Sequence, residues 1–130
     1  MQRRLEWIDT DAAGHWHNAT LWRFVEEAEA LLHRDLGIIA TTFGHTPRRR
    51  VEADFFTPLR FDRSATVTLR VASVGRTSAT YEVDVADGDI AIARARVVIV
   101  FIDADGQPSR WPDEVARALS DGVPAHPPVG

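Results

Sequence analysis

The stretch DTDAAGHWHNATLWRFVEEAEALLHRDL, residues 9–36, joins a polar loop directly to an amphipathic segment. The apolar residues of the second part recur at intervals of three and four, which places them on one face of a helix. They are Leu21, Phe24, Val25, Ala28, Leu31, Leu32 and Leu36. Asn18 is a favourable N-cap residue, and Gly37 stands where a helix commonly ends. The sequence therefore predicts a helix over residues 19–36 with one face in the core.

The loop before this helix carries two carboxylates, two imidazoles, a glycine and a tryptophan. A helix N-terminus offers unpaired N–H donors and the positive end of a dipole, so it favours negative charge beside it. We therefore expect any chemistry of this chain to lie where the loop enters the helix.

Five segments have the period-two alternation or the apolar runs of strands: 3–8, 51–56, 65–71, 79–85 and 90–102. The last four are expected to follow one another as consecutive hairpins. Residues 97–102 are apolar on both faces, which predicts a central strand covered on both sides. Residues 38–50 are expected to form a surface connection, and residues 112–119 a short helix. The fold class is therefore α+β, with one antiparallel sheet that buries the helix.

Length and composition restrict the function classes. The 130 residues suit one domain, residues 1–121, followed by a flexible tail over 122–130. No long apolar run and no apolar signal core are present, so neither a membrane span nor secretion is supported, and a cytoplasmic protein is expected. The net charge of −4 argues against nucleic acid as a partner. Because there is no cysteine or lysine, thiolate and Schiff-base chemistry are excluded.

Other site types fit the loop poorly. An EF-hand needs oxygen ligands and a glutamate at positions where this chain has Ala13 and Thr20. His15 and His17 lack a third ligand placed by spacing, so we expect no metal. No serine lies in a nucleophile elbow. A carboxylate remains, although a loop carboxylate such as Asp11 is also commonly bonded only to nearby backbone N–H groups.

The residues DTDAAGHWHNATLWRFVEEAE resemble the signature of hot-dog-fold acyl-CoA thioesterases of the 4-hydroxybenzoyl-CoA thioesterase type, in which an Asp-x-Asp-x-x-Gly loop leads into the central helix. The segments VEADFFTPLRFDRSATV and DADGQPSRWPDEV also follow that family's layout. The resemblance implies a hot-dog domain, a curved antiparallel sheet of about five strands wrapped around one long helix.

The resemblance also implies an enzyme that hydrolyses an acyl-CoA or acyl-carrier-protein thioester to free acid and thiol, without a cofactor. Asp11 matches the family's catalytic carboxylate, and the backbone N–H of Asn18 matches the donor that polarises the thioester carbonyl. His15 matches the histidine after the glycine in one version of the motif. Many relatives have Tyr-His where this chain has His17-Asn18. Whether Asp11 acts as general base or as nucleophile stays open.

Substrate contacts are expected from the loop residues and from cations and aromatic residues near it. The phosphates of coenzyme A or phosphopantetheine require arginine here, for which strand ends offer Arg60, Arg63 and Arg76, and residues 48–50 are further candidates. Aromatic side chains are expected to line an acyl pocket. The predicted substrate-binding residues are Gly14, His15, Trp16, His17, Phe55, Arg60 and Arg76, with Phe56 as a further pocket residue.

The sequence leaves two alternative functions open. One is a hot-dog module that binds acyl thioesters without catalysis. The other is a hydratase or dehydratase, disfavoured because the loop lacks that group's Asp-x-x-x-x-His pattern. Trp7, Trp16, Trp22 and the two-sided apolar strand predict surfaces that one copy leaves uncovered. We therefore expect a homodimer or a dimer of dimers with twofold symmetry.

Overall fold

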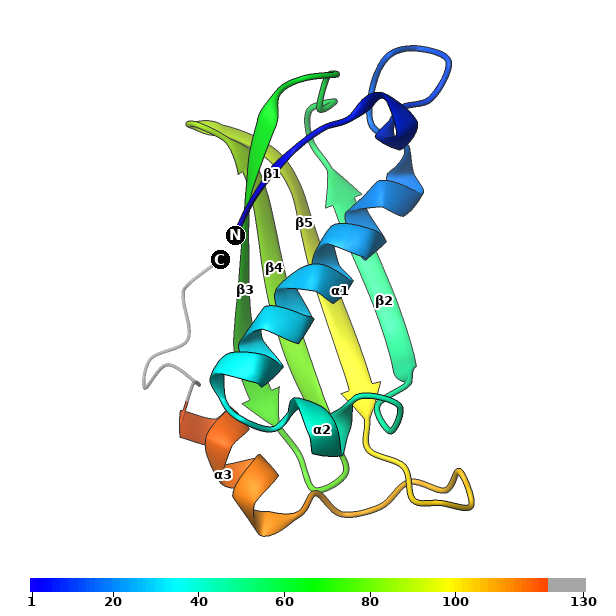
Figure 1. Ribbon diagram of the computed structural model, residues 1–130, viewed down its shortest axis with the longest axis vertical. Helices are drawn as coiled ribbons and strands as arrows, with labels where there is room; N and C mark the ends of the chain where they lie inside the picture. The colour runs from blue at the N-terminus through cyan, green and yellow to red at the C-terminus, as the bar shows by residue number, and fades with distance from the viewer. Residues whose placement is uncertain (122–130) are drawn as a thin grey trace.

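The computed structural model describes residues 1–121 (Figure 1). The predicted tail over 122–130 lies outside the described residues. One antiparallel sheet curves around a long helix that crosses a single face, as Figure 1 shows. The elements are β1 (Gln2–Arg4), a 3₁₀ turn η1 (Trp7–Asp9), α1 (Asn18–Asp35), α2 (Ile39–Thr42), β2 (Arg48–Phe55), β3 (Ser64–Val74), β4 (Ser78–Asp87), β5 (Ile90–Val100) and α3 (Asp113–Asp121). The α+β prediction is confirmed.

The long helix begins one residue earlier than predicted, and its N-cap is His17 rather than Asn18. His17 has an extended backbone, and its Nδ1 accepts a hydrogen bond of 3.1 Å from the Ala19 N–H. A ring nitrogen can take the place of the usual side-chain oxygen because a neutral imidazole has one acceptor. Asn18 is therefore the first helical residue, a position whose N–H has no partner within the helix.

The C-terminus of α1 is closed as the sequence predicts. Gly37 has a φ of +73°, and its N–H donates to the Arg34 carbonyl at 3.0 Å. The next N–H, of Ile38, donates to the His33 carbonyl at 2.9 Å. These two bonds form a Schellman motif, in which a residue in the left-handed region stops the helix.

The first half of the predicted apolar stripe is buried, whereas in the second half Leu32 and Leu36 are only partly buried against the core. Leu21, Phe24, Val25 and Ala28 are all buried against the sheet, whereas Leu31 is 41% exposed. In the second half the buried positions are taken by Glu29 and His33, at 4% and 0% exposure. Polar side chains therefore occupy the core-facing side of α1 near α2.

The sheet has the order β1-β3-β4-β5-β2. β3, β4 and β5 follow as hairpins, but β2 pairs with β5 and not with β3, so the prediction of consecutive hairpins is wrong for β2. Residues 56–63 cross the end of the sheet instead, where Leu59 is fully buried. β5 lies inside the sheet as expected, although β4 is the middle strand. β2 and the three-residue β1 form the two edges.

Two predicted boundaries and one predicted exposure need correction. The first strand ends at Arg4, because residues 7–9 turn into the η1 helix, whose Asp9 side chain accepts a 2.9 Å bond from the Glu6 N–H. Residues 38–50 contain α2 and the start of β2. Trp16 is only 6% exposed, so within one copy it is not the uncovered surface that was predicted, whereas Trp7 is 69% exposed.

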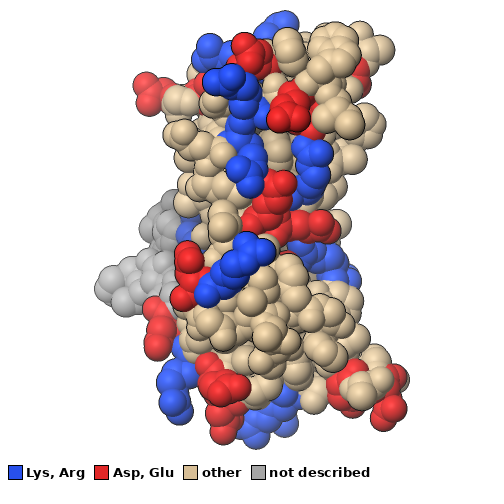
Figure 2. Space-filling model, in the orientation of Figure 1, with Lys and Arg blue, Asp and Glu red and all other residues tan. Residues whose placement is uncertain are grey.

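The surface of the α1 side carries both charges. Figure 2 shows arginine and acidic side chains interleaved over the exposed side of the helix. One such pair joins Arg3 to Glu27 at 2.5 Å. No helix within residues 1–121 is long and apolar enough to cross a bilayer.

Candidate active site

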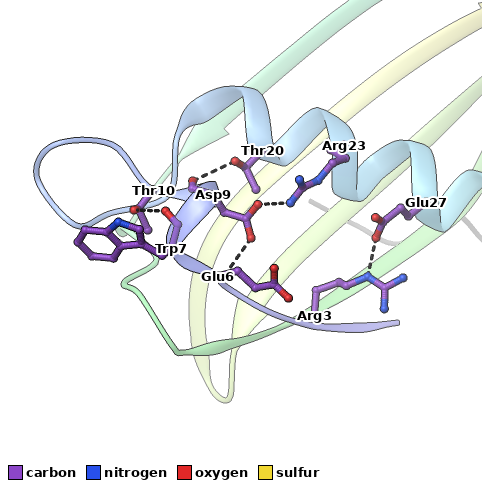
Figure 3. Close-up of polar contacts among 8 residues, drawn as sticks. All are labelled: Arg3, Glu6, Trp7, Asp9, Thr10, Thr20, Arg23 and Glu27. Atoms are coloured by element: carbon purple, nitrogen blue, oxygen red, sulfur yellow. Dashed lines mark hydrogen bonds and ion pairs between the residues drawn. The ribbon is translucent and has the colours of Figure 1, made fainter.

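The two aspartates of the loop have different environments, and Asp9 is the structural one. Its side chain is 3% exposed and accepts hydrogen bonds from the Glu6 N–H and from the Arg23 guanidinium of α1 (Figure 3). Its carbonyl oxygen accepts from the His17 N–H at 2.7 Å and from the Thr20 hydroxyl at 3.0 Å. Asp9 therefore fastens the loop to the first turns of α1 and leaves no oxygen free for a substrate.

Asp11 is exposed and begins a tight turn. The Gly14 N–H donates to the Asp11 carbonyl at 3.1 Å, and Gly14 has a φ of +79°, which favours glycine. One carboxylate oxygen of Asp11 accepts a 2.8 Å bond from the Ala13 N–H. Within residues 1–121, Asp11 forms no ion pair and its other carboxylate oxygen has no hydrogen-bond partner. The turn thus orients the carboxylate while keeping one oxygen available.

A cleft of about 230 Å³ opens beside Asp11, and it is where the loop meets the end of β2. Its floor is aromatic: the buried Trp16 ring packs edge-on against Phe55, with 6.0 Å between centroids, and lies 6.2 Å from Phe24. Such a floor suits an apolar acyl group. The residues that line the cleft are Asp11, His15, Trp16, Phe55, Phe56, Thr57 and Pro58.

The amino end of α1 offers one free main-chain donor. The Asn18 N–H makes no hydrogen bond within the described part of the chain, whereas the next amide, that of Ala19, is occupied by the His17 ring. Asn18 does not itself line the cleft of Asp11. A free amide at a helix N-terminus is a donor suited to an oxyanion.

The segment 59–61 fixes the loop from the other side. The Trp16 N–H donates to the Leu59 carbonyl at 2.8 Å, and the Phe61 N–H donates to the Gly14 carbonyl at 3.2 Å. Between these bonds, Arg60 pairs with His15 in a β-bridge and is exposed. The structure therefore brings Arg60 beside the loop, together with Gly14, His15, Trp16 and Phe55.

The other proposed cations lie elsewhere or are engaged. Arg63 donates two hydrogen bonds to Asp87, at 2.8 and 3.0 Å, and these hold the pKa of Arg63 above its usual range. Arg76 lies in the turn between β3 and β4, at the end of the sheet that carries α3, away from the loop (Figure 1). Its carbonyl accepts from the Trp111 N–H. One copy of the chain therefore does not bring Arg76 to the cleft.

Sequence reasoning missed a buried polar cluster between α1, α2 and the sheet. Glu29 accepts a 2.7 Å bond from Arg48, and the nearby Tyr81 hydroxyl acts with Arg48 to lower the pKa of its carboxyl against the effect of burial. The His33 ring lies 2.5 Å from both the Thr42 and the Tyr81 hydroxyl oxygens. The available signal was the spacing: Glu29 and His33 continue the i, i+4 series of Val25 on the core-facing side.

Burial is the largest cause of the pKa shifts in this cluster. It raises the pKa of Glu29, against the opposing effect of the bond from Arg48. It lowers the pKa of His33 to about 4, with the positive charge of Arg48 as the second cause. It also raises the pKa of Tyr81, assisted by the charge of Glu29. His33 is therefore neutral at pH 7. Beside this cluster, a second cavity of about 280 Å³ lies between Glu29, Arg48 and Phe43.

Comparison with known proteins identifies the family. The profile of the thioesterase-like superfamily matches residues 5–119, which run from the loop before α1 through β2 to β5 and most of α3. The chain belongs to the thioesterase-like superfamily. No curated protein matches the chain.

Solved structures share the thioesterase-like fold over nearly the whole chain. A hypothetical protein from Aquifex aeolicus is 25% identical, with a TM-score of 0.85 over 92% of this chain and 97% of its own. A probable thioesterase from Bartonella henselae is also 25% identical, with a TM-score of 0.79 over 86% of this chain and 97% of its own. A 1,4-dihydroxy-2-naphthoyl-CoA thioesterase from Synechocystis, at 19% identity, shows likeness of fold alone, with a TM-score of 0.83 over 93% and 94%.

The hot-dog architecture is thus shared with other thioesterase-like proteins. No group of three or more histidine, aspartate or glutamate side chains within residues 1–121 is placed to hold a metal ion.

Proposed function

We propose that this chain is a thioesterase of the 4-hydroxybenzoyl-CoA thioesterase type, which hydrolyses an acyl-CoA or acyl-carrier-protein thioester to a free acid and a thiol in the cytoplasm. One observation carries the proposal: Asp11 presents an unpaired carboxylate oxygen to a cleft with an aromatic floor, at the amino end of α1. An exposed carboxylate fixed by a turn beside an apolar cleft is suited to act on a bound acyl group.

The geometry supports the following chemistry. Attack on the thioester carbonyl carbon creates negative charge on its oxygen, which the free Asn18 N–H and the helix dipole stabilise. Asp11 accepts the proton of the attacking water, the C–S bond breaks, and that proton goes to the departing thiolate. In the second route Asp11 is the nucleophile: its oxygen attacks the carbonyl carbon, the thiolate leaves, and water then cleaves the resulting anhydride. Both routes require the same carboxylate oxygen.

Substrate binding is proposed to use both sides of the loop. Trp16 and Phe55 contact the acyl group, while Gly14, His15 and His17 line its approach. The exposed Arg60 guanidinium is placed to meet a phosphate of coenzyme A or phosphopantetheine. Arg76 is proposed to act only if another copy brings it to the cleft. The Synechocystis neighbour is a thioesterase for an aromatic acyl-CoA, and another neighbour is a gentisyl-coenzyme A thioesterase, so aromatic acyl-CoAs are the first substrates to test.

The test is thiol release from a panel of aromatic, branched and straight-chain acyl-CoAs. Wild type is expected to turn over at least one of them, and Asp11→Asn to lose at least a hundredfold in kcat while still binding the substrate. Asp62→Asn is the matched control, because Asp62 is an exposed aspartate at the same end whose positive φ also suits asparagine. Equal turnover by Asp11→Asn would overturn the assignment.

The same panel separates the two alternatives. Binding of acyl-CoAs without thiol release would favour the non-catalytic acyl-thioester-binding module. Loss of absorbance of an enoyl thioester without thiol release would favour the hydratase. Neither alternative uses the free oxygen of Asp11 for hydrolysis, so both predict that wild type and Asp11→Asn release thiol equally slowly.

A further inference from the structure

The loop before α1 is a tight hairpin that sets Asp11 and His15 opposite each other. The Asp11 N–H donates to the His15 carbonyl at 2.8 Å, and the Gly14 N–H donates to the Asp11 carbonyl at 3.1 Å. These bonds are those of a three-residue hairpin loop that a glycine of positive φ completes. Residues directly opposite each other in such a pair point to the same face, with Cβ atoms about 5 Å apart. The Asp11 carboxylate and the His15 imidazole are therefore neighbours, and both line the cleft.

A guanidinium continues this row on the other side of His15. His15 and Arg60 form an antiparallel bridge, which is held by the main-chain bonds of the neighbouring residues at 2.8 and 3.2 Å. Opposite residues that exchange no hydrogen bond themselves are the pairs whose side chains come closest together. The order across the loop is therefore carboxylate, imidazole, guanidinium, with His15 in the middle.

The imidazole of His15 is free to exchange a proton. Within residues 1–121 its ring forms no hydrogen bond, ion pair or aromatic contact. The other histidines of this part of the chain have structural partners: His17 caps α1, His33 is buried between two hydroxyl groups, and His45 packs against an aromatic ring. His15 thus combines a place in the cleft with a ring that the fold does not use.

Hydrolysis of a thioester requires a proton at the sulfur as well as a base for the attacking group. When the C–S bond breaks, the sulfur departs as a thiolate, and the pKa of an ordinary thiol such as cysteine is about 8.5. Imidazole takes up and releases protons between about pH 5 and 8, so it is suited to protonate such a leaving group. In the substrate, the sulfur lies between the carbonyl carbon, which Asp11 faces, and the arm whose phosphate is proposed to meet Arg60. His15 has the same middle position in the row.

We propose that His15 is the general acid of this site, a catalytic residue that gives its proton to the departing thiolate. The proposal rests on the thioesterase function proposed above. When water attacks, Asp11 takes a proton from it, the C–S bond breaks, and the protonated His15 ring gives its proton to the sulfur. The proton held by Asp11 then passes to the neutral ring, which restores both side chains and leaves the free acid and the thiol as products.

His15 also serves the route through an anhydride. The Asp11 oxygen bonds to the carbonyl carbon, the C–S bond breaks, and His15 protonates the thiolate as before. The neutral ring then takes a proton from the water that cleaves the anhydride, which releases the free acid and returns Asp11 as a carboxylate. The ring is protonated again at the end of the cycle. The role of His15 is therefore the same whether Asp11 is base or nucleophile.

The test compares two thioesters of one acid that differ in the leaving thiol. One is the acyl-CoA that wild type hydrolyses fastest, and the other is the 4-nitrothiophenyl ester of the same acid, whose more acidic thiol leaves readily without a proton. His15→Gln is expected to lower kcat about a hundredfold for the acyl-CoA and less than about threefold for the nitrothiophenyl ester. Asp11→Asn is expected to slow both reactions, because attack on the carbonyl carbon precedes the departure of either thiol.

Two control variants separate this role from binding and from folding. His45→Gln alters an exposed histidine that does not line the cleft, and is expected to leave both rates unchanged. Arg60→Gln is expected to raise KM for the acyl-CoA without the selective loss of kcat, since a phosphate contact does not act on the sulfur. The urea midpoints of His15→Gln and wild type are expected to coincide, because the ring has no partner to lose.

The pH profile of the acyl-CoA reaction gives a second readout. The charged groups that face the ring are the Asp11 carboxylate and the Arg60 guanidinium, and the other residues that line the cleft carry no charge. Because a neutral ring has no proton to give, kcat of wild type is expected to fall as the pH rises, and His15→Gln is expected to lack that fall. This measurement uses the acyl-CoA alone, so it decides the matter if the nitrothiophenyl ester is not a substrate.

An equal loss of kcat on both thioesters, or a fall with rising pH that persists in His15→Gln, would overturn the acid role of His15. Either result would leave the thioesterase function intact. If wild type releases thiol from neither thioester, the proposed function itself fails, and the role of His15 falls with it.

Discussion

His33 Nε2 lies 2.5 Å from the hydroxyl oxygen of Tyr81, and this contact joins the core-facing side of α1 to the middle strand of the sheet. Both side chains are fully buried. The apolar pattern predicts a continuous hydrophobic stripe on α1, but at this position a hydrogen-bonded pair joins the helix to the sheet. Because both groups are buried, neither can bond water if it loses its partner.

Tyr81→Phe is expected to lower the free energy of unfolding by about 1–3 kcal/mol, because it leaves the buried Nε2 of His33 without a partner. Urea denaturation measures the loss. Thr66→Val, on the exposed side of β3, is the control and is expected to change stability by less than about 0.5 kcal/mol. A Tyr81→Phe protein as stable as wild type would contradict the role of this contact.

His33 makes the stability depend on pH. Its pKa is lowered from 6.5 to about 4 in the folded chain, so between these values the unfolded chain binds more protons. Stability is therefore lost as the pH falls from 6.5 to 4, by up to about 3 kcal/mol from this group. His33→Gln, which keeps hydrogen-bonding capacity, is expected to flatten that decline. The raised pKa of Glu29 acts in the opposite direction and is common to both proteins, so their difference reports His33.

The two loop aspartates are expected to separate stability from activity. Asp9→Asn removes the charge that Arg23 binds in a buried position, and should lower the free energy of unfolding by about 2 kcal/mol. Asp11→Asn should change stability by less than about 0.5 kcal/mol, because Asp11 is exposed and asparagine also forms the turn. Denaturation of both variants under one set of conditions checks this. A larger loss for Asp11→Asn than for Asp9→Asn would contradict these roles.

Phe55 is expected to affect the substrate more than the fold. It is half exposed and contacts Trp16 across the cleft, so Phe55→Ala should raise KM for aromatic acyl-CoAs several-fold with a modest effect on stability. Phe61→Ala is the comparison, since Phe61 is similarly exposed but packs on Trp7 outside the cleft. Equal effects of the two substitutions on KM would place the acyl group elsewhere.

The sequence predicts most of the architecture because local signals and the global fold agree. The three–four spacing of Leu21, Phe24 and Val25 and the glycine at 37 place α1 within one residue at each end. The path of β2 is not predictable in this way, because alternation shows that a segment is a strand but not which strand it pairs with. Its partner β5 is set by the crossing segment 56–63, whose Leu59 is buried at the end of the sheet.

The site was predictable in part for similar reasons. The turn from Asp11 to Gly14 follows from local chemistry, since glycine supplies the positive φ. Arg23 binds Asp9 and not Asp11. This choice depends on how the loop packs against the helix, which the spacing of the residues alone does not show. The positions of Arg60 and Arg76 at opposite ends of the sheet depend on strand pairing, so the sequence could not separate them.

The central claim is that a thioester carbonyl binds at the amino end of α1, where the Asn18 N–H stabilises its oxygen. Asn18→Pro removes this N–H at a helix position that proline favours, and the preceding His17 already has the extended backbone that proline requires. Asn18→Ala keeps the N–H. The decisive measurement is kcat for thiol release by these two variants. We predict that Asn18→Pro is slower than Asn18→Ala by about a hundredfold or more at unchanged stability, and equal rates in two folded proteins would contradict the claim.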